Sequence, residues 1–295
     1  MNSLKFLAAT DFSDDARHAA NRAACLAAER QAPLELLHVM SSPSLATLRE
    51  LFGLSPDADA KLLDDAQLML DELGSEIAAG KPQLALTARV AVGQVLDEIL
   101  AASEKADMLI LGARGLNPLR DLILGTTAER LLRRCKKPVL LNKRPPQGSY
   151  RQVIVPVDFS PHSAAALHMA RFVAPAAEMT LVHAFGTPYE GKLWLAGVPD
   201  EEIHRYRTQA RQQALNHIHA LIGETRDDPC RYYISVEHDD AAPLILAKET
   251  ALAADLIVIG KHGQSLIEDT LLGSVTRHIL SDSKCDVLVV QEEPS

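Results

Sequence analysis

The chain of 295 residues has few cysteines and no long apolar segment, and both absences narrow its class. The cysteines lie far apart and form no C-x-x-C pair, which favours free thiols in a reducing compartment over a metal or redox site. No apolar run approaches the ~18 residues of a membrane-spanning helix. Residues 1–5 lack the charged start and apolar core of a secretory signal. We therefore expect a cytoplasmic protein with no membrane partner.

Positive charge is also scarce, with 30 Lys and Arg against 39 Asp and Glu and a formal net charge of −9. This balance argues against nucleic-acid binding, which requires a basic face. It leaves room for a small anionic ligand, because backbone amides and single cations can hold one. The Walker lysine–serine pair is absent as well, and no general base stands beside a nucleophile near the motifs described next. We expect no catalytic residues and no protein-held metal site.

A glycine motif occurs twice, each time after an apolar segment. In the second half, residues 256–259 lead into Gly260–Gly263, and nine residues separate this loop from Gly273. In the first half, residues 108–111 lead into Gly112–Gly115, and nine residues again precede Gly125. The shift between the copies is 148 (260 − 112). One G-x-x-G arises by chance, but two in register within a repeat indicate a built site.

The motif has the features of a phosphate cradle. The preceding aliphatic run is typical of a buried parallel strand. Glycines let a ligand approach the backbone closely, and free amides at a helix start favour an anion. Ser274 is expected to cap the helix that follows the second motif, and Thr126 with Glu129 fits a capping box after the first. The alternative is that the glycines are plain turns where strands end.

The glycine motif belongs to a repeat that spans the whole chain. Asp11 and Asp158 each follow a short apolar strand at a shift of 147 (158 − 11), and the same alternation of strands and helices follows both. This order predicts an α/β fold of two tandem doubly wound domains. Each should be a five-stranded parallel sheet, in the order 3-2-1-4-5, flanked by helices. We place the domains at residues 1–144 and 151–295, with a linker at 145–150 that begins with two prolines.

Residues typical of helix starts, loops and strands predict where the individual elements lie. Ser13 or Asp14 should cap the first helix, and Ser160 followed by Pro161 should start its counterpart. Residues 40–56 contain two prolines, a glycine and several serines and are expected to form a loop. The expected strands are 4–9, 34–39, 84–92, 108–111 and 139–141 in the first half, and 153–157, 179–183, 232–236, 256–259 and 287–290 in the second.

Together these features resemble the universal stress protein family in its tandem two-domain form. The resemblance covers essentially the whole chain. It rests on both glycine motifs, on the strand ends with Asp11 and Asp158, on the second-strand ends with His38-Val39 and His183-Ala184, and on the closing helix–strand segments. In that family the spaced-glycine motif separates members that bind nucleotide from members that bind none. The resemblance therefore implies an adenine-nucleotide ligand.

The resemblance also implies which residues hold the nucleotide, expected to be ATP, with ADP or AMP as alternatives and with Mg²⁺ as a companion ion. Asp11 and Asp158 would lie against the adenine or ribose, and Val39 and Ala184 would contribute backbone contacts to the adenine. The implied nucleotide-binding residues of the first half are Ala9, Asp11, Val39, Gly112, Arg114, Gly115, Gly125, Thr126 and Thr127. Those of the second half are Pro156, Asp158, Ala184, Gly260, His262, Gly263, Gly273, Ser274 and Val275.

Several of these residues have a simpler interpretation. The two aspartates could only cap the first helix of each half, and Arg114 and His262 could be solvated rather than bound to phosphate. His38 and His183 are expected to be structural. His217 and His219 lie two residues apart and do not share a helix face, which argues against a metal site.

The second half departs from the family pattern at residues 238–241, His-Asp-Asp-Ala, where the first half has a glycine. We expect this acidic segment near the pocket mouth, where it would disfavour a triphosphate in the absence of a divalent metal. The two pockets should therefore differ in affinity.

Three functions remain open on the sequence. The first is an ATP-binding stress-response regulator or chaperone-like protein with slow or no hydrolysis. The second is an interaction scaffold that needs no nucleotide, and the third is a weak ATPase or phosphotransfer enzyme. The last strands, 139–141 and 287–290, are too apolar for bare edges. We expect them to lie against each other and make the halves a pseudo-dimer, with a further homodimer between chains.

Overall fold

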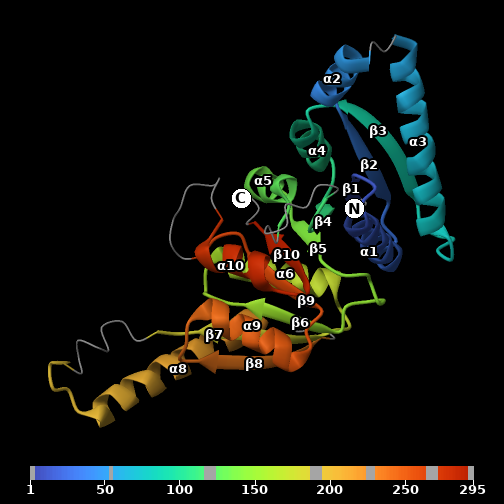
Figure 1. Ribbon diagram of the computed structural model, residues 1–295. Coiled ribbons are helices and arrows are strands. Elements are labelled where there is room, and N and C mark those ends of the chain that lie inside the picture. The colour runs from blue at the N-terminus through green and yellow to red at the C-terminus, as the bar shows by residue number, and fades with distance from the viewer. Residues whose placement is uncertain are drawn as a thin grey trace. The chain divides into compact units, whose positions relative to one another are not determined.

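The structure of the protein, a computed structural model, describes residues 4–52, 56–115, 124–186, 195–223, 230–263 and 272–291 (Figure 1). The chain divides into two compact units, Met1–Ser149 and Tyr150–Ser295. Among the described helices, none is both long and apolar enough to cross a lipid bilayer.

The first unit alternates strands and helices around one sheet. Its strands are all paired in parallel, in the order β3-β2-β1-β4-β5, which confirms the predicted order. Helices α1 and α3 cover one face of the sheet, and α4 covers the other with α5 packed against it (Figure 1). The elements are β1 (Phe6–Thr10), α1 (Asp14–Arg30), β2 (Leu34–Ser41), α2 (Ser42–Phe52), α3 (Pro56–Ala78), β3 (Leu86–Gly93), α4 (Val95–Ser103), β4 (Met108–Gly112), α5 (Thr126–Arg134) and β5 (Val139–Asn142).

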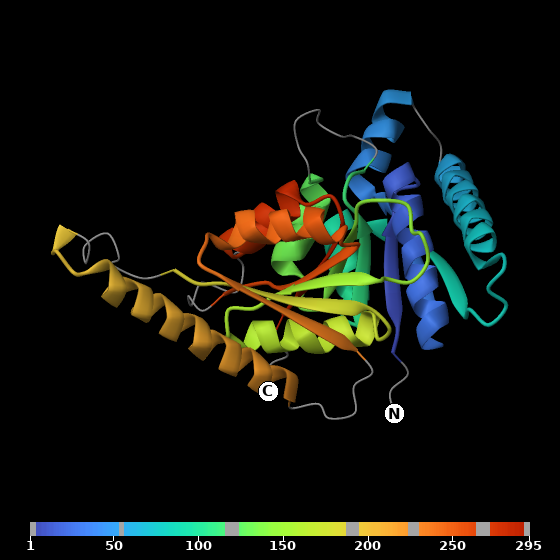
Figure 2. The ribbon, with the colours of Figure 1, turned by 90° about the horizontal axis from the view of Figure 1, so that it is seen from below.

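The second unit repeats this plan. Its parallel strands follow the order β8-β7-β6-β9-β10. Helices α6 and α8 lie on one side of this sheet, and α9 and α10 lie on the other (Figure 2). The elements are β6 (Gln152–Pro156), α6 (Pro161–Val173), β7 (Glu178–Ala184), α8 (Asp200–Gly223), β8 (Arg231–Glu237), α9 (Ala241–Leu252), β9 (Leu256–Gly260), α10 (Ser274–Asp282) and β10 (Asp286–Val290).

Burial explains why the central strands are continuous apolar runs. All five residues of β1 and all five of β9 are buried, because helices cover these strands on both faces. Strand β3 lies at the end of its sheet, and its residues alternate between exposed and partly exposed. A strand covered on both faces needs apolar side chains at every position, whereas an outer strand does not.

The segment expected as a loop, residues 40–56, is instead largely helical. Strand β2 continues to Ser41 and α2 occupies Ser42–Phe52. Pro43 stands in the first turn of α2, where a missing N–H costs nothing, and Leu45 is buried. The proline and serines that suggested a loop are therefore helix-start residues.

The predicted N-caps of α1 and α6 are confirmed, whereas those of α5 and α10 are not. Ser13 and Ser160 are the N-caps of α1 and α6, and their hydroxyls accept from the amides of Ala16 and Ser163. Pro161 opens α6 as predicted. The expected caps Thr126 and Ser274 were wrong. Each is the first residue of its helix, and the N-caps are the glycines one position earlier.

A charged cluster joins three neighbouring strand regions in the first unit. The Glu35 carboxylate of β2 accepts hydrogen bonds from Lys5 Nζ and from Arg89 Nε, the latter at 2.9 Å. The Glu35 side chain is only 12% exposed. Burial raises the pKa of Glu35, but the hydrogen bonds and charges of Lys5 and Arg89 outweigh it, so the pKa lies below its ordinary value.

We expect Glu35→Gln to lower the free energy of unfolding by about 1–2 kcal/mol at pH 7, because it removes a carboxylate that accepts two charge-assisted hydrogen bonds. A depressed pKa stabilises the fold above the unfolded value of about 4.3 and ceases to do so as the pH falls through the folded value. The difference from the parent should therefore shrink below about pH 4. Urea unfolding at several pH values measures it. The exposed Glu104→Gln is the control, and an equal loss in both variants would contradict the role of Glu35.

Candidate functional site

Each unit has a pocket at the carboxyl ends of its central strands. The volumes are about 490 Å³ in the first unit and about 370 Å³ in the second, within the range of small-molecule sites. The nine residues predicted from the first half all line the first pocket: Ala9, Asp11, Val39, Gly112, Arg114, Gly115, Gly125, Thr126 and Thr127. The nine predicted from the second half all line the second: Pro156, Asp158, Ala184, Gly260, His262, Gly263, Gly273, Ser274 and Val275.

A fixed turn holds the aspartate of each pocket. In the first unit, Oδ1 of Asp11 accepts from the amide of Ser13 at 3.1 Å and from its hydroxyl. In the second, Oδ1 of Asp158 accepts from the amide of Ser160 at 3.0 Å and from its hydroxyl. Each aspartate therefore supports the serine that caps the following helix, and it does not cap the helix itself. The same carboxylate lines the pocket, so the structural role and the predicted ligand role are compatible.

The residue after each aspartate adopts a left-handed backbone. Phe12 has φ of 65° and Phe159 has φ of 64°, conformations uncommon for residues other than glycine. The ring of Phe12 packs against that of His38 in a tilted arrangement, with centroids 4.4 Å apart. Phe159 packs in the same way against His183, at 4.5 Å. These contacts hold a strained turn beside each pocket.

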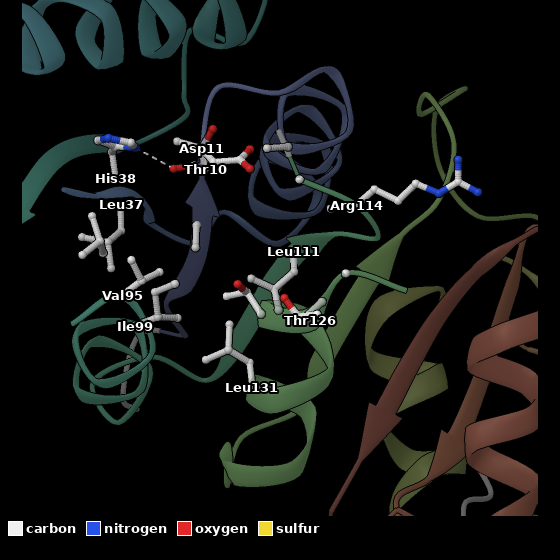
Figure 3. Close-up of a pocket in the computed structure, with 18 of the residues that line it drawn as sticks. Thr10, Asp11, Leu37, His38, Val95, Ile99, Leu111, Arg114, Thr126 and Leu131 are labelled. Atoms are coloured by element: carbon white, nitrogen blue, oxygen red, sulfur yellow. Dashed lines mark hydrogen bonds between the residues drawn. The ribbon is translucent and has the colours of Figure 1, made fainter. Parts of the chain in front are cut away.

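The two histidines are structural, as expected. Nδ1 of His38 lies 2.8 Å from the carbonyl oxygen of Thr10, a contact drawn in Figure 3. Nδ1 of His183 lies 2.7 Å from the carbonyl oxygen of Val157. Because a carbonyl can only accept, Nδ1 carries the proton in both rings. Each histidine thus ties the second strand of its unit to the end of the first.

The first glycine of each motif permits close packing of a helix. A Cβ on Gly112 would lie 2.8–2.9 Å from backbone atoms of Asp15 and Ala16 at the start of α1. A Cβ on Gly260 would lie 2.7 Å from the Cβ of His162 in α6. Among the described residues, the glycines with positive φ are outside both motifs. These glycines are therefore not left-handed turns, and the first of each motif is required for the close approach of a helix.

The second glycine of each motif makes room for the aspartate. A Cβ on Gly115 would lie 2.5 Å from Oδ2 of Asp11, and a Cβ on Gly263 would lie 2.7 Å from Oδ2 of Asp158. Any side chain at these positions would displace the carboxylate or shift the loop. In each G-x-x-G motif, the first glycine thus leaves room for a neighbouring helix and the second leaves room for the aspartate carboxylate.

The third glycine begins a helix. Within the described part of the chain, no side chain caps α5 at Gly125 or α10 at Gly273. The amides of the two glycines instead donate to the carbonyls of Ala113 at 2.8 Å and Lys261 at 2.9 Å. The amides of the next residues have no acceptor inside their helix. Each pocket therefore faces a helix start whose N–H groups can bind an anion.

An apolar wall completes each pocket, and the sequence analysis missed it. Figure 3 shows the wall of the first pocket on the side away from Arg114. Its side chains come from β2, α4, β4 and α5: Leu37, Val95, Ile99, Leu111 and Leu131. The second pocket has Val182, Ile245 and Ile259 at equivalent positions, and Leu272, just before Gly273, adds to its apolar lining. The apolar faces of the third helices were the available signal, but that pattern is equally expected for core packing.

The two predicted cations differ in position. Figure 3 shows the Arg114 side chain extending away from Asp11 and Thr126. Arg114 is exposed, in agreement with the solvated interpretation. His262 lines the second pocket, and its ring centroid lies 5.5 Å from that of His162.

The acidic segment 238–241 reaches the second pocket at one residue. Ala241 lines the pocket, and Asp239 and Asp240 are not among the described lining residues. Both aspartates are exposed, and Oδ1 of Asp239 accepts from the amide of Asp240 at 2.8 Å. Their carboxylates therefore add negative charge near the pocket rather than in its lining.

Comparison with known proteins agrees with this architecture. A universal stress protein of Mycolicibacterium smegmatis is 26% identical over 303 aligned positions, which cover 97% of this chain and 96% of that protein. One of Mycobacterium bovis is 26% identical over 209 positions, and the match spans 70% of this chain but less than two thirds, 65%, of that protein. Among solved structures, a universal stress protein from Archaeoglobus fulgidus has a TM-score of 0.72 at 20% identity, covering 99% of this chain and 100% of that one.

The family itself is decided by a direct match. The sequence model of the universal stress protein family matches residues 3–143 and again residues 149–291. The two matches correspond to the two units and together account for nearly the whole sequence. The chain therefore belongs to the universal stress protein family and carries two copies of its domain in tandem.

Proposed function

We propose that each unit binds one adenine nucleotide and that the chain acts as a nucleotide-binding stress-response regulator or chaperone-like protein in the cytoplasm. One observation carries the proposal. In both units, a carboxylate and an uncapped helix start face the same cavity, whose other wall is apolar. A nucleotide presents the matching chemistry, with an apolar base, ribose hydroxyls and an anionic phosphate end.

The chemistry of the lining residues matches the parts of a nucleotide. The apolar wall with Leu37 and Ile99 would receive the base, and Asp11 would accept from the ribose hydroxyls or the adenine amino group. The amides at the start of α5, with the hydroxyls of Thr126 and Thr127, would bind the phosphates. A helix start contributes only ~0.3–1 kcal/mol to a phosphate, or up to ~2 kcal/mol when partly buried. Burial of the base must therefore supply much of the affinity.

We propose binding with slow or no hydrolysis. The titratable groups among the described lining residues of the first pocket are Asp11, His38 and Arg114. Asp11 and His38 are engaged in holding the turn, and Arg114 extends outward. ATP is the expected ligand, with ADP or AMP as alternatives. Bound Mg²⁺ would neutralise phosphate charge. Occupancy would then change shape or partner choice.

We expect adenine nucleotide to remain with the protein through native purification, where mass analysis of the released ligand would identify it. After removal of that ligand, ATP at ~100 times its dissociation constant should stabilise the fold by roughly 2.7 kcal/mol. Isothermal calorimetry and thermal melting would measure this. No heat above dilution, together with no melting shift at millimolar ATP, would contradict the proposal. Turnover of ATP abolished by Ser274→Ala would instead favour an enzyme.

A further inference from the structure

The two units carry opposite charges at one equivalent position of the helix that begins at the pocket. Gly125 and Gly273 cap equivalent helices, and the fourth residue after each glycine is Glu129 in α5 and Arg277 in α10. Arg277 lines the second pocket, whereas Glu129 is not among the described lining residues of the first. The units therefore differ at the helix start that faces the cavity.

Glu129 is explained within its own helix. Its carboxylate pairs with Arg133 one turn later, at 2.6 Å. An acidic residue in the first turn also suits the positive end of the helix dipole. In α5 this residue therefore serves helix stability and adds negative charge beside the pocket.

Arg277 has no such explanation. Among the described residues, no carboxylate forms an ion pair with it, and the first turn of α10 contains no acidic residue. A cation in the first turn opposes the helix dipole, so it weakens the helix unless an anion lies nearby. The lining of the second pocket also includes His262, and Gly273 and Ser274 at the helix start. An anion bound in this pocket would have Arg277, His262 and the amides of the helix start available to it.

We propose that Arg277 is a phosphate-binding residue that makes the second pocket select the more highly phosphorylated nucleotide. The inference rests on the proposed nucleotide function and goes beyond it. The first pocket has Glu129 at the equivalent position, and its Arg114 extends away, so it discriminates less between ATP and AMP. The acidic segment 238–241 does not oppose this preference at the cavity lining, because Asp239 and Asp240 are not among the described lining residues.

The test isolates each pocket in the full chain. Gly115→Val is designed to block the first pocket and Gly263→Val the second, because each new side chain would displace the aspartate carboxylate that lines the pocket. With the first pocket blocked, Arg277→Ala should weaken ATP binding about fivefold at low salt and AMP binding less than about twofold, since an exposed charge pair gains most with the more anionic ligand. Arg277→Lys should retain part of the preference, and added salt should reduce it. Calorimetry with ATP and AMP, with and without Mg²⁺, measures the ratio.

A matched change in the first pocket provides the control. With the second pocket blocked, Glu129→Arg should raise the preference for ATP over AMP by about fivefold. The ion pair with Arg133 that this change removes is solvent-exposed and contributes little to stability, so the folded state should persist. If Gly115→Val disturbs the fold, Thr127→Trp at the exposed pocket rim replaces it as the blocking change. An unchanged ATP-to-AMP ratio in variants that still bind ATP overturns the role of Arg277 alone. Absence of nucleotide binding in the parent chain overturns both proposals.

Discussion

A chain with valine at both Gly115 and Gly263 should bind ATP at least about 100-fold more weakly than the parent, a loss of about 2.7 kcal/mol per site. In each motif the new Cβ would lie within 2.7 Å of the aspartate Oδ2, so the carboxylate must leave its place. That movement removes the acceptor proposed for the ribose and fills part of the cavity. A lost charge-assisted hydrogen bond contributes about 1.5–3 kcal/mol, and overpacking adds to it.

The control for this double variant is Gly186→Val. A Cβ at Gly186 meets nothing within 4 Å, so ATP affinity and melting temperature should remain those of the parent. ATP binding by the double variant at parental affinity would show that the aspartate pockets do not hold the nucleotide. Recovery of the same protein partners by the double variant and the parent would favour a scaffold that needs no nucleotide.

Gly112→Ala should lower the free energy of unfolding by about 3 kcal/mol. The added methyl group would lie 2.8, 2.9 and 2.9 Å from three backbone atoms at the start of α1. Backbone atoms cannot rotate aside as a flexible side chain can, so α1 would have to move away from β4. Chemical denaturation monitored by circular dichroism would give the difference.

Gly125→Ala is the matched comparison, because it belongs to the same motif. Its added Cβ would lie 3.4 Å from the carbonyl oxygen of Ala113, a contact that needs little adjustment. Alanine is a poorer N-cap than glycine, so we expect a loss of about 1 kcal/mol or less. Equal losses at Gly112 and Gly125 would show that helix packing is not what requires the first glycine.

The strand order and the pocket lining could be predicted because both depend on local patterns. Apolar runs that end in a glycine or an aspartate mark central parallel strands, and parallel strands bring those ends to one edge of the sheet. All eighteen predicted residues line the two pockets for this reason. Their nucleotide contacts stay predictions.

Other features could not be predicted because they depend on packing between distant segments. Helix α2 was taken for a loop, since proline and serine signal both loops and helix starts. The sequence analysis assigned the glycines to ligand approach, and the motif alone could not show that Gly112 also packs against a helix start and Gly115 against an aspartate. Thr126 and Ser274 have side chains that are common at N-caps, but the N-cap of each helix is the glycine one residue earlier. The importance of Arg277 emerges only when the pocket shows which way the helix faces.

One carboxylate in each unit belongs to two structures at once. Oδ1 of Asp11 holds Ser13, and Ser13 fixes the beginning of α1, while the same side chain borders the cavity. A molecule that displaces the carboxylate would therefore also disturb the first turn of α1, because only Ser13 lies between them. Occupancy inside the domain would in this way reach the start of the helix through two neighbouring side chains.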